Sequence, residues 1–216
     1  RWEIRYGADP KKIKVVYNGV SPWVFVPKPK PAKTAHRATV VAVTKVVPIK
    51  DIETMIRSAA LALQSIPDIY YLIYGSLTEN PLYVEKCRRL VAELNLEGTV
   101  EFGGFDSRAA ELYTEGDISV ISSISESCPY ALLESMSCAR PVVSTDVGDV
   151  RKILRGFGII VPPRNPEALG QAVVKLLKDD ELRLQLGRRA RQEILTKYDD
   201  SKMINNYLEL YQQLAR

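Results

Sequence analysis

Two glutamates stand eight residues apart where an apolar stretch gives way to a helical pattern. Glu126 lies in the run 123–130 (SISESCPY), and Glu134 lies in the first or second turn of a helix predicted over 130–138. A helix N-terminus carries unpaired N–H groups and the positive end of the helix dipole, so it favours anions. Carboxylates accept hydrogen bonds from ligand hydroxyls. The pattern predicts a site for a polyol that carries a phosphate. The alternative is that both glutamates only cap the helix and balance its dipole.

Two lysines in an earlier loop supply the opposite charge. Lys45 and Lys50 flank the run 46–49 (VVPI), and Lys50 comes just before another predicted helix. If both loops face one crevice, the two ammonium groups could clamp a diphosphate beside Glu126. The alternative is a pair of exposed loop lysines, which is where lysine is usually found.

Several common chemistries are excluded by residues that the sequence lacks. The single histidine, His36, lies in a Pro/Lys stretch, so histidine triads and histidine-rich metal sites are unavailable. There is no Asp-x-Asp pair, no G-x-x-x-x-G-K-[ST] and no G-x-G-x-x-G, which argues against a carboxylate cage for a metal, a P-loop and a dinucleotide fingerprint. Cys128 lies near the helix start, where a thiol pKa could be lowered, but no histidine is available to act with it. Cys87 and Cys138 are predicted to fill the core.

Six strand-like runs alternate with helical patterns from residue 39 onward. Strands are predicted over 39–44, 70–74, 99–102, 117–122, 142–145 and 159–161, with one further short strand over 13–17. Helices are predicted to start at Asp51, Asn80-Pro81, Ser107, Asn165-Pro166, Asp180 (running to 198) and Ser201, with two more over 130–138 and 150–154. This alternation predicts an α/β fold with a doubly wound parallel sheet, Rossmann-like, of about six strands. Ligands of such sheets bind outside the carboxyl ends of the strands, which indicates the loops after residues 44, 74, 102, 122 and 145.

Charge is spread unevenly along the 216 residues. Residues 1–50 carry eleven Lys/Arg and two acids, whereas residues 51–216 carry nineteen and twenty-four. The basic start is interpreted as a solvated linker, with nucleic acid, a membrane surface or phosphate ligands as alternatives. Three cysteines without a C-x-x-C pair favour a reducing cytoplasm, and no apolar run approaches 18 residues, so no membrane span is expected. Because the chain begins with Arg1 and its first Met is Met55, we expect it to be a piece of a longer protein.

These motifs together resemble a known family. The run Glu126-x7-Glu134 within 123–148 (SISESCPYALLESMSCARPVVSTDVG) is similar to the E-x7-E signature of retaining glycosyltransferases of the large GT-B group 4. Residues 43–51 (VTKVVPIKD) resemble that family's G-R-x-x-x-x-K-[GD] phosphate loop, and residues 15–20 (VVYNGV) resemble the linker that enters its C-terminal domain. VPIKDIETMIRSA, SSISES and STDVG look most like the transferase of the Pel exopolysaccharide system. The resemblance covers about residues 10–212.

The resemblance implies a role for each matched residue. Lys45 and Lys50 would contact the donor diphosphate, Glu126 would hold hydroxyls of the transferred sugar, and the turn Gly103-Gly104-Phe105 would lie beside the base. Glu134 would hold the ribose hydroxyls of the nucleotide. The implied catalytic residues are Glu126, Lys50 and Lys45, and the implied donor-binding residues are Glu134, Ser127, Cys128, Pro129, Tyr130, Ala131, Leu132, Gly104, Phe105 and Gly75. The nucleotide-sugar is a substrate, and the resemblance implies no cofactor and no metal.

The resemblance also implies how the chain is organised. Residues 1–37 would form an incoming linker, residues 38–200 a nucleotide-sugar-binding Rossmann-like domain, and residues 201–216 a helix returning toward a missing N-terminal acceptor domain. The chain would be the donor-binding half of a cytoplasmic hexosyltransferase of polysaccharide biosynthesis, moving a sugar from a UDP-sugar to a saccharide or another acceptor. Alone it would bind nucleotide weakly and transfer little. No nucleic acid partner is expected, and peripheral membrane contact by the longer parent stays open.

Three departures from the family's pattern leave a second function open. Lys45 stands where the family usually has Arg, Ala139 where it has Gly before Lys/Arg-Pro, and Asp149 where it has a second Gly. Lysine keeps the charge but loses the bidentate geometry of arginine, and Asp149 would add a negative charge near the crevice. The alternative is a nucleotide-sugar-binding module without catalysis.

Overall fold

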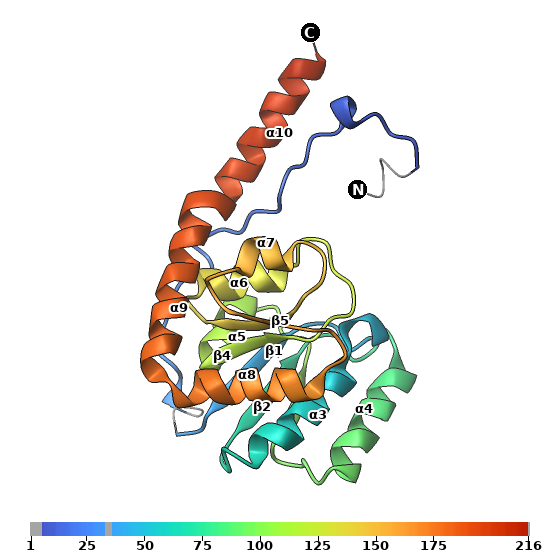
Figure 1. The fold of residues 1–216 in the computed structure, drawn as a ribbon, viewed down its shortest axis with the longest axis vertical. Coiled ribbons are helices and arrows are strands. Elements are labelled where there is room, and N and C mark those ends of the chain that lie inside the picture. Colours follow the sequence, from blue (N-terminus) through green and yellow to red (C-terminus); the bar gives the residue numbers. More distant parts are fainter. Residues whose placement is uncertain (1–5, 33–35, 216) are drawn as a thin grey trace.

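A parallel six-stranded sheet forms the centre of the protein (Figure 1). The computed structural model describes residues 6–32 and 36–215. The strands are β1 (Thr39–Val43), β2 (Tyr70–Tyr74), β3 (Val100–Gly104), β4 (Ile118–Ile121), β5 (Val142–Thr145) and β6 (Ile159–Val161). They lie in the order β3-β2-β1-β4-β5-β6, and each neighbouring pair is parallel. The predicted Rossmann-like α/β fold of about six strands is confirmed.

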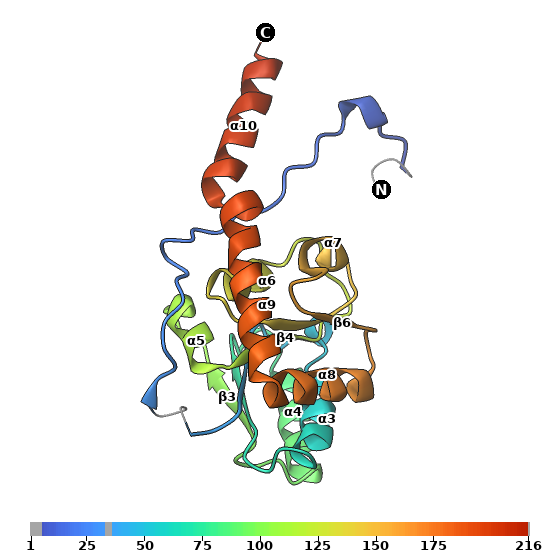
Figure 2. The ribbon, with the colours of Figure 1, turned by 60° about the vertical axis from the view of Figure 1, so that its left-hand side comes forward.

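Helices connect the strands and cover both faces of the sheet. They are α3 (Ile52–Leu63), α4 (Pro81–Glu93), α5 (Ala109–Glu115), α6 (Tyr130–Ser137), α7 (Val150–Leu154), α8 (Pro166–Lys178), α9 (Asp180–Glu193) and α10 (Asp200–Leu214), with short helical turns η1 (Pro10–Lys12), η2 (Pro48–Lys50) and η3 (Ile194–Tyr198). Side chains of a strand point to alternate faces. Val40 and Ala42 therefore pack with α3, α4 and α8, while Val41 packs with α5 on the other face. Helices α6, α7 and α9 complete that second face (Figure 2).

Three helix starts predicted from Asp and Asn are confirmed. Asp51, Asn80 and Asn165 each accept a hydrogen bond from the backbone N–H three residues later, at 3.3, 3.0 and 2.8 Å. These side chains satisfy N–H groups that the helix itself leaves unpaired. The helices that follow β1, β2 and β6 consequently begin where the sequence places them.

The two predicted serine caps, Ser107 and Ser201, are wrong because nearby aspartates accept the hydrogen bonds instead. α5 begins without a side-chain cap, and Asp106 accepts the N–H of Arg108 at 2.8 Å. Asp199 is the N-cap of α10 and accepts the N–H of Ser201 at 2.8 Å. A carboxylate is favoured over a hydroxyl at the positive end of a helix.

The helix predicted from 180 to 198 is interrupted before its end. α9 stops at Glu193, and the π-helical turn η3 continues the chain to Tyr198. The carbonyl of Tyr198 accepts the N–H of Val20 at 2.9 Å, and Val20 forms a parallel bridge with Asp199. The strand predicted over 13–17 is wrong, because no described strand pairs with this irregular segment. Figure 1 shows this segment and α10 extending away from the body of the domain.

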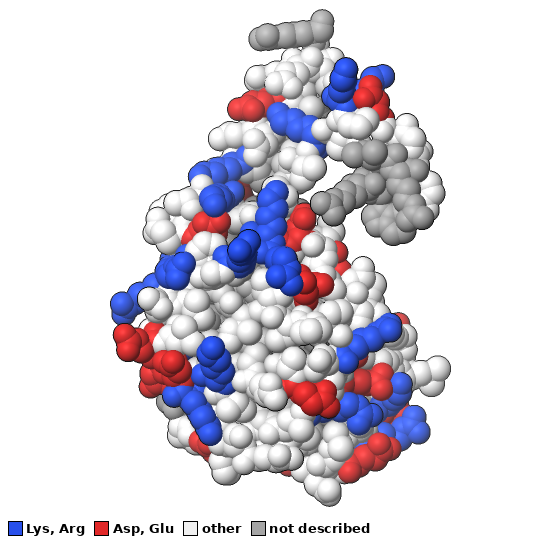
Figure 3. Space-filling view, in the orientation of Figure 1, with Lys and Arg blue, Asp and Glu red and all other residues white. Residues whose placement is uncertain are grey.

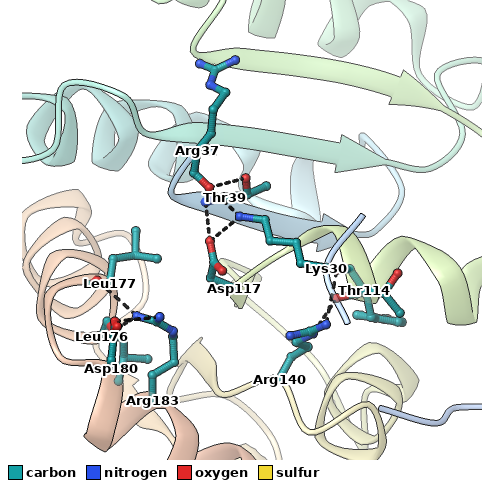
Figure 4. A network of polar contacts seen from close by, with 11 residues as sticks. Lys30, Arg37, Thr39, Thr114, Asp117, Arg140, Leu176, Leu177, Asp180 and Arg183 are labelled. Carbon is teal, nitrogen blue, oxygen red and sulfur yellow. Dashed lines mark hydrogen bonds and ion pairs between the residues drawn. The ribbon is translucent and has the colours of Figure 1, made fainter. Parts of the chain in front are cut away.

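Part of the basic start of the chain is anchored to the sheet (Figure 4). Lys30 Nζ lies 2.7 Å from Asp117 Oδ2, and the same oxygen accepts the N–H of Thr39, the first residue of β1, at 2.8 Å. Arg140 donates to the carbonyl of Lys28 at 2.7 Å. Lys30 thus has a structural role and is not simply solvated.

On the face drawn in Figure 3, lysines and arginines are interspersed with acids rather than gathered into a continuous basic stripe.

Candidate functional site

Two adjoining cavities lie along the carboxyl ends of the strands. The first, of about 370 Å³, is lined by Lys45, Lys50, Glu126 and residues 127–131. The second, of about 290 Å³, is lined by Lys45, Gly75, Phe105 and Glu134 among others. Both cavities include Lys45 with its neighbours 43 and 44, so they adjoin there, and we call the two together the groove. The edge predicted for ligands is therefore hollowed by cavities.

Eleven of the thirteen predicted site residues line this groove. The two exceptions are Leu132 and Gly104. Leu132 is fully buried in the core under α6, and Gly104 ends β3 with φ +72° next to the exposed Phe105. Leu132 therefore contributes packing, and its backbone N–H donates to the carbonyl of Pro129 at 3.2 Å. Leu132, which the resemblance places among the donor-binding residues, thus has both its side chain and its N–H engaged within the protein.

Lys50 and Glu126 form an ion pair in the first cavity. Lys50 Nζ lies 2.5 Å from Glu126 Oε1, and Ser123 Oγ donates to the same oxygen at 2.7 Å. The side chains are only 23% and 12% exposed. Ser122 Oγ also donates to the carbonyl of Lys50 at 2.7 Å, which joins the loops that follow β1 and β4. The sequence placed these residues in two separate loops, and the fold brings them into contact.

The start of α6 is open toward the first cavity. Its N-cap is Pro129, and no side chain caps the helix. Glu126 pairs with Lys50 and Ser123 instead, so the interpretation that both glutamates only cap this helix is wrong. The backbone N–H groups of Tyr130 and Ala131, which line the cavity, have no side-chain acceptor in α6's own cap. Such N–H groups at a helix N-terminus suit an anion.

Glu134 lies in the second cavity and accepts a hydrogen bond from a buried tyrosine. Tyr113 of α5 donates its hydroxyl to Glu134 Oε2 at 2.7 Å. Burial raises the pKa of Glu134, while the hydrogen bond from Tyr113 opposes that rise. The pKa of Tyr113 is also raised by its burial, so its hydroxyl remains a proton donor to the carboxylate.

Lys45 lies between the two cavities and pairs with an acid that sequence reasoning missed. Lys45 Nζ is 3.1 Å from Glu79 on the loop after β2, and both side chains are substantially exposed. An exposed pair of this kind contributes little to stability. The signal that could have identified Glu79 is its position in the loop that follows the end of a predicted strand.

Glycines allow the loops of the site to approach one another closely. A Cβ on Gly75, whose φ is +153°, would lie 1.8 Å from the carbonyl oxygen of Thr44. A Cβ on Gly148, whose φ is +54°, would lie 2.2 Å from the carbonyl oxygen of Glu126. Asp149 donates its N–H to the carbonyl of Ser127 at 3.0 Å, but it lines neither cavity. Burial raises the pKa of Cys128, which lines the first cavity, and the negative charge of Asp149 adds to that rise, so Asp149 acts beside the crevice without lining it.

Cys128 and Asn18 meet at the rim of the first cavity. Burial raises the pKa of the Cys128 thiol, which overturns the expectation that a helix start lowers it. Asn18 Nδ2 donates to the carbonyl of Cys128 at 2.8 Å and lines the cavity itself. From the sequence, Asn18 had no role beyond its place in the run 15–20 that resembles the family's linker. Cys87 and Cys138 are buried, as predicted.

The described residues provide neither a cluster of metal ligands nor a membrane-spanning helix. Among the described residues, no group of three or more His, Cys, Asp or Glu side chains is arranged to hold a metal ion. Across residues 6–32 and 36–215, no helix combines the length and the apolar character needed to cross a membrane.

Sequence comparison identifies relatives over most of the chain. The family model "Glycosyl transferases group 1" matches residues 27–193. D-inositol 3-phosphate glycosyltransferase from Kineococcus radiotolerans is 30% identical over 209 residues, covering 86% of this chain and 48% of the relative. N-acetyl-alpha-D-glucosaminyl L-malate synthase from Bacillus anthracis is 29% identical over 130 residues, covering 59% of this chain and 34% of the relative. The chain spans half or less of the length of these relatives.

Solved structures with the same fold extend the comparison. HepE from Anabaena, solved in complex with UDP, superposes with a TM-score of 0.89 at 21% identity, covering 97% of this chain and 60% of that one. The C-terminal domain of LpcC from Francisella tularensis superposes with a TM-score of 0.74 at 20% identity, covering 84% of this chain and 99% of that one. At these identities the likeness shows the fold, which is that of a GT-B C-terminal domain. Because the family model covers more than half of the chain, the protein belongs to the group 1 glycosyl transferases.

Proposed function

We propose that this chain is the donor-binding half of a retaining hexosyltransferase of GT-B group 4, which moves a sugar from a UDP-sugar to a saccharide or another acceptor. The observation that carries the proposal is the groove made by the two adjoining cavities. Lys45, Lys50 and Glu126 line the first cavity together with the open start of α6, and Glu134 of the same helix lines the second. The groove combines two carboxylates, which accept hydrogen bonds from hydroxyl groups, with two lysine cations and a helix N-terminus. A nucleoside diphosphate sugar presents the complementary groups in one molecule.

Each part of the groove has a role in the proposal. Lys50 and Lys45 bind the diphosphate together with the backbone N–H groups of Tyr130 and Ala131. Departure of the nucleoside diphosphate builds negative charge on its phosphate, and donors already in place stabilise that charge by roughly 3–4 kcal/mol each. Glu126 orients the sugar through its hydroxyls, and Glu134 accepts hydrogen bonds from ribose. The proposal needs no metal and no cofactor, because the lysines and amides balance the phosphate.

The relatives support the UDP-sugar donor and a two-domain organisation of the longer parent. HepE was solved with UDP, and the relative from Kineococcus radiotolerans is a glycosyltransferase of which this chain covers 48%. We infer that residues 1–37 enter from an N-terminal acceptor domain and that residues 201–216 return toward it, so that the acceptor binds between the two domains. Within group 4, the motifs favour an enzyme of the Pel type that builds a polysaccharide in the cytoplasm.

A binding module without catalysis remains the second candidate. The favouring observation is that Lys45, in place of the family's usual Arg, is paired with Glu79. A lysine held by a carboxylate offers the diphosphate a weaker clamp than a free guanidinium fork.

The test begins with calorimetry of UDP and UDP-glucose binding to this chain. Glu126→Gln is expected to weaken UDP-glucose binding without weakening UDP binding. In the proposal Glu126 holds the sugar, and its contact with the phosphate-binding groups is the ion pair with Lys50, whose loss leaves the Lys50 cation free for the diphosphate. Glu97→Gln, at an exposed residue outside the groove, is the matched control and should change neither affinity. Failure of the unmodified chain to bind either compound would refute the proposal. In the longer parent, turnover that Glu126→Ala abolishes identifies the enzyme, and binding without turnover identifies the module.

A further inference from the structure

The hydroxyl of Tyr113 is the one hydrogen-bond donor that the described chain provides to the Glu134 carboxylate. It lies 2.7 Å from Oε2, and no side chain or backbone group of the described residues donates to Oε1. Glu134 lines the second cavity, so Oε1 is the acceptor available to a ligand there. A carboxylate oxygen has two lone pairs and can accept from two neighbouring hydroxyls.

Tyr113 is fixed so firmly that it can act as a rigid support. It is fully buried, and its backbone carbonyl accepts a hydrogen bond from Arg140 Nε at 3.1 Å. The ring of Phe25 packs edge-on against it, with ring centroids 6.2 Å apart. Because its backbone and ring are already held in place, Tyr113 loses little conformational entropy when its hydroxyl bonds to the Glu134 carboxylate.

We infer that Tyr113 is a positioning residue: it holds Glu134 with one oxygen turned to the cavity and thereby gives the site its preference for a nucleotide that carries ribose hydroxyls. This inference rests on the proposed function. The hydrogen bond also favours the ionised carboxylate, which is the form that accepts from both hydroxyls. Without Tyr113, Glu134 would remain buried with no donor, and it would protonate at a higher pH.

The other groups around Glu134 come from every loop of the second cavity. They are Lys45 after β1, Tyr74 as the last residue of β2, Glu79 after β2, Asp106 after β3, and Cys138 directly after α6. Lys45 is paired with Glu79, and Tyr74 donates its hydroxyl to Glu115 at 2.9 Å. The hydrogen bond from Tyr113 is therefore the main influence opposing the effect of burial on Glu134.

The test compares UDP with 2′,3′-dideoxyuridine diphosphate, which lacks both ribose hydroxyls. Calorimetry of the unmodified chain should show a clear preference for UDP. Tyr113→Phe is expected to weaken UDP binding about tenfold or more, since a hydrogen bond to a charged group is lost, and to leave binding of the dideoxy nucleotide unchanged. When the pH is lowered, UDP affinity should also begin to fall at a higher pH in Tyr113→Phe than in the unmodified chain.

Tyr71→Phe is the matched control, because Tyr71 is similarly buried, its hydroxyl lies near Ser58 of α3 without a well-formed hydrogen bond, and it lines neither cavity. A double variant separates position from stability: with Glu134→Gln present, adding Tyr113→Phe should produce little further loss of UDP affinity. Equal losses for UDP and the dideoxy nucleotide in Tyr113→Phe, or no loss for UDP, would overturn the inference alone. An unmodified chain that binds both nucleotides equally would overturn the ribose role of Glu134, and with it this part of the proposed function.

Discussion

Gly148 should tolerate no side chain, because the loop after β5 presses directly on the loop that carries Glu126. A Cβ at Gly148 would lie 2.2 Å from the carbonyl oxygen of Glu126 and 2.7 Å from that of Ser127. Both oxygens belong to the backbone, so neither can move without shifting the loop. The left-handed φ of +54° costs an L-residue about 1–2 kcal/mol, and overpacking adds about 1–3 kcal/mol. Gly148→Ala is therefore expected to lower the free energy of unfolding by about 2–5 kcal/mol.

Gly98→Ala is the matched control for this prediction. Gly98 also has a positive φ, +80°, but a Cβ there would meet nothing within 4 Å. Its substitution should cost only the backbone term of about 1–2 kcal/mol. Urea unfolding of both variants gives the energetic cost of the clash as the difference between their losses in the free energy of unfolding. Calorimetry should show weaker UDP-glucose binding in Gly148→Ala and unchanged binding in Gly98→Ala. Equal destabilisation of the two variants, or unaltered UDP-glucose affinity in Gly148→Ala, would show that the loop after β5 does not hold Glu126 in place.

Three further substitutions test other parts of the structure. Ala139→Gly should raise the free energy of unfolding by roughly 1 kcal/mol, because Ala139 has φ +54° at the end of α6. The midpoint of thermal unfolding should then rise by about 2–4 °C. An unchanged midpoint would contradict this prediction. Asp117→Ala should destabilise the protein by about 1–3 kcal/mol in urea unfolding, since the N–H of Thr39 loses its acceptor and the largely buried Lys30 keeps only the carbonyl of Arg37. Glu53→Ala, at the more exposed pair with Lys86, should cost less than about 1 kcal/mol in the same titration. Lys45→Arg should tighten UDP binding by restoring a bidentate fork, and an unchanged affinity would place Lys45 outside the phosphate contacts.

The sheet could be predicted because its signals are local. The strands at 70–74, 142–145 and 159–161 match the structure residue for residue, since short β-branched and apolar runs bounded by turn residues rarely have another use. Asn80-Pro81 and Asn165-Pro166 also fix their helix starts locally, because the cap and the missing proline N–H act within one turn. Once six strands alternate with helices, the ligand edge follows from topology.

The contacts within the site could be predicted only in part, because they join distant segments. The sequence placed Lys50 and Glu126 on one edge, but it gave no sign that Ser123 would share their ion pair. Tyr113 was hidden in an ordinary amphipathic helix, and its contact with Glu134 depends on how α5 and α6 pack. The lowered thiol pKa expected for Cys128 failed for the same reason: burial, which is a property of the whole fold, outweighs the local helix dipole.

The segment interpreted as a linker supports the groove from outside it. Asn18 satisfies the carbonyl of Cys128 in the loop before α6, and Phe25 packs against the ring of Tyr113. Arg191 of α9 binds the carbonyl of Phe25 at 3.0 Å, and Ser137 at the end of α6 donates to the same carbonyl at 2.7 Å. The N-terminal segment therefore contacts both ends of the helix whose start faces the first cavity and whose Glu134 faces the second. A shift of this segment must therefore alter the support of both cavities together.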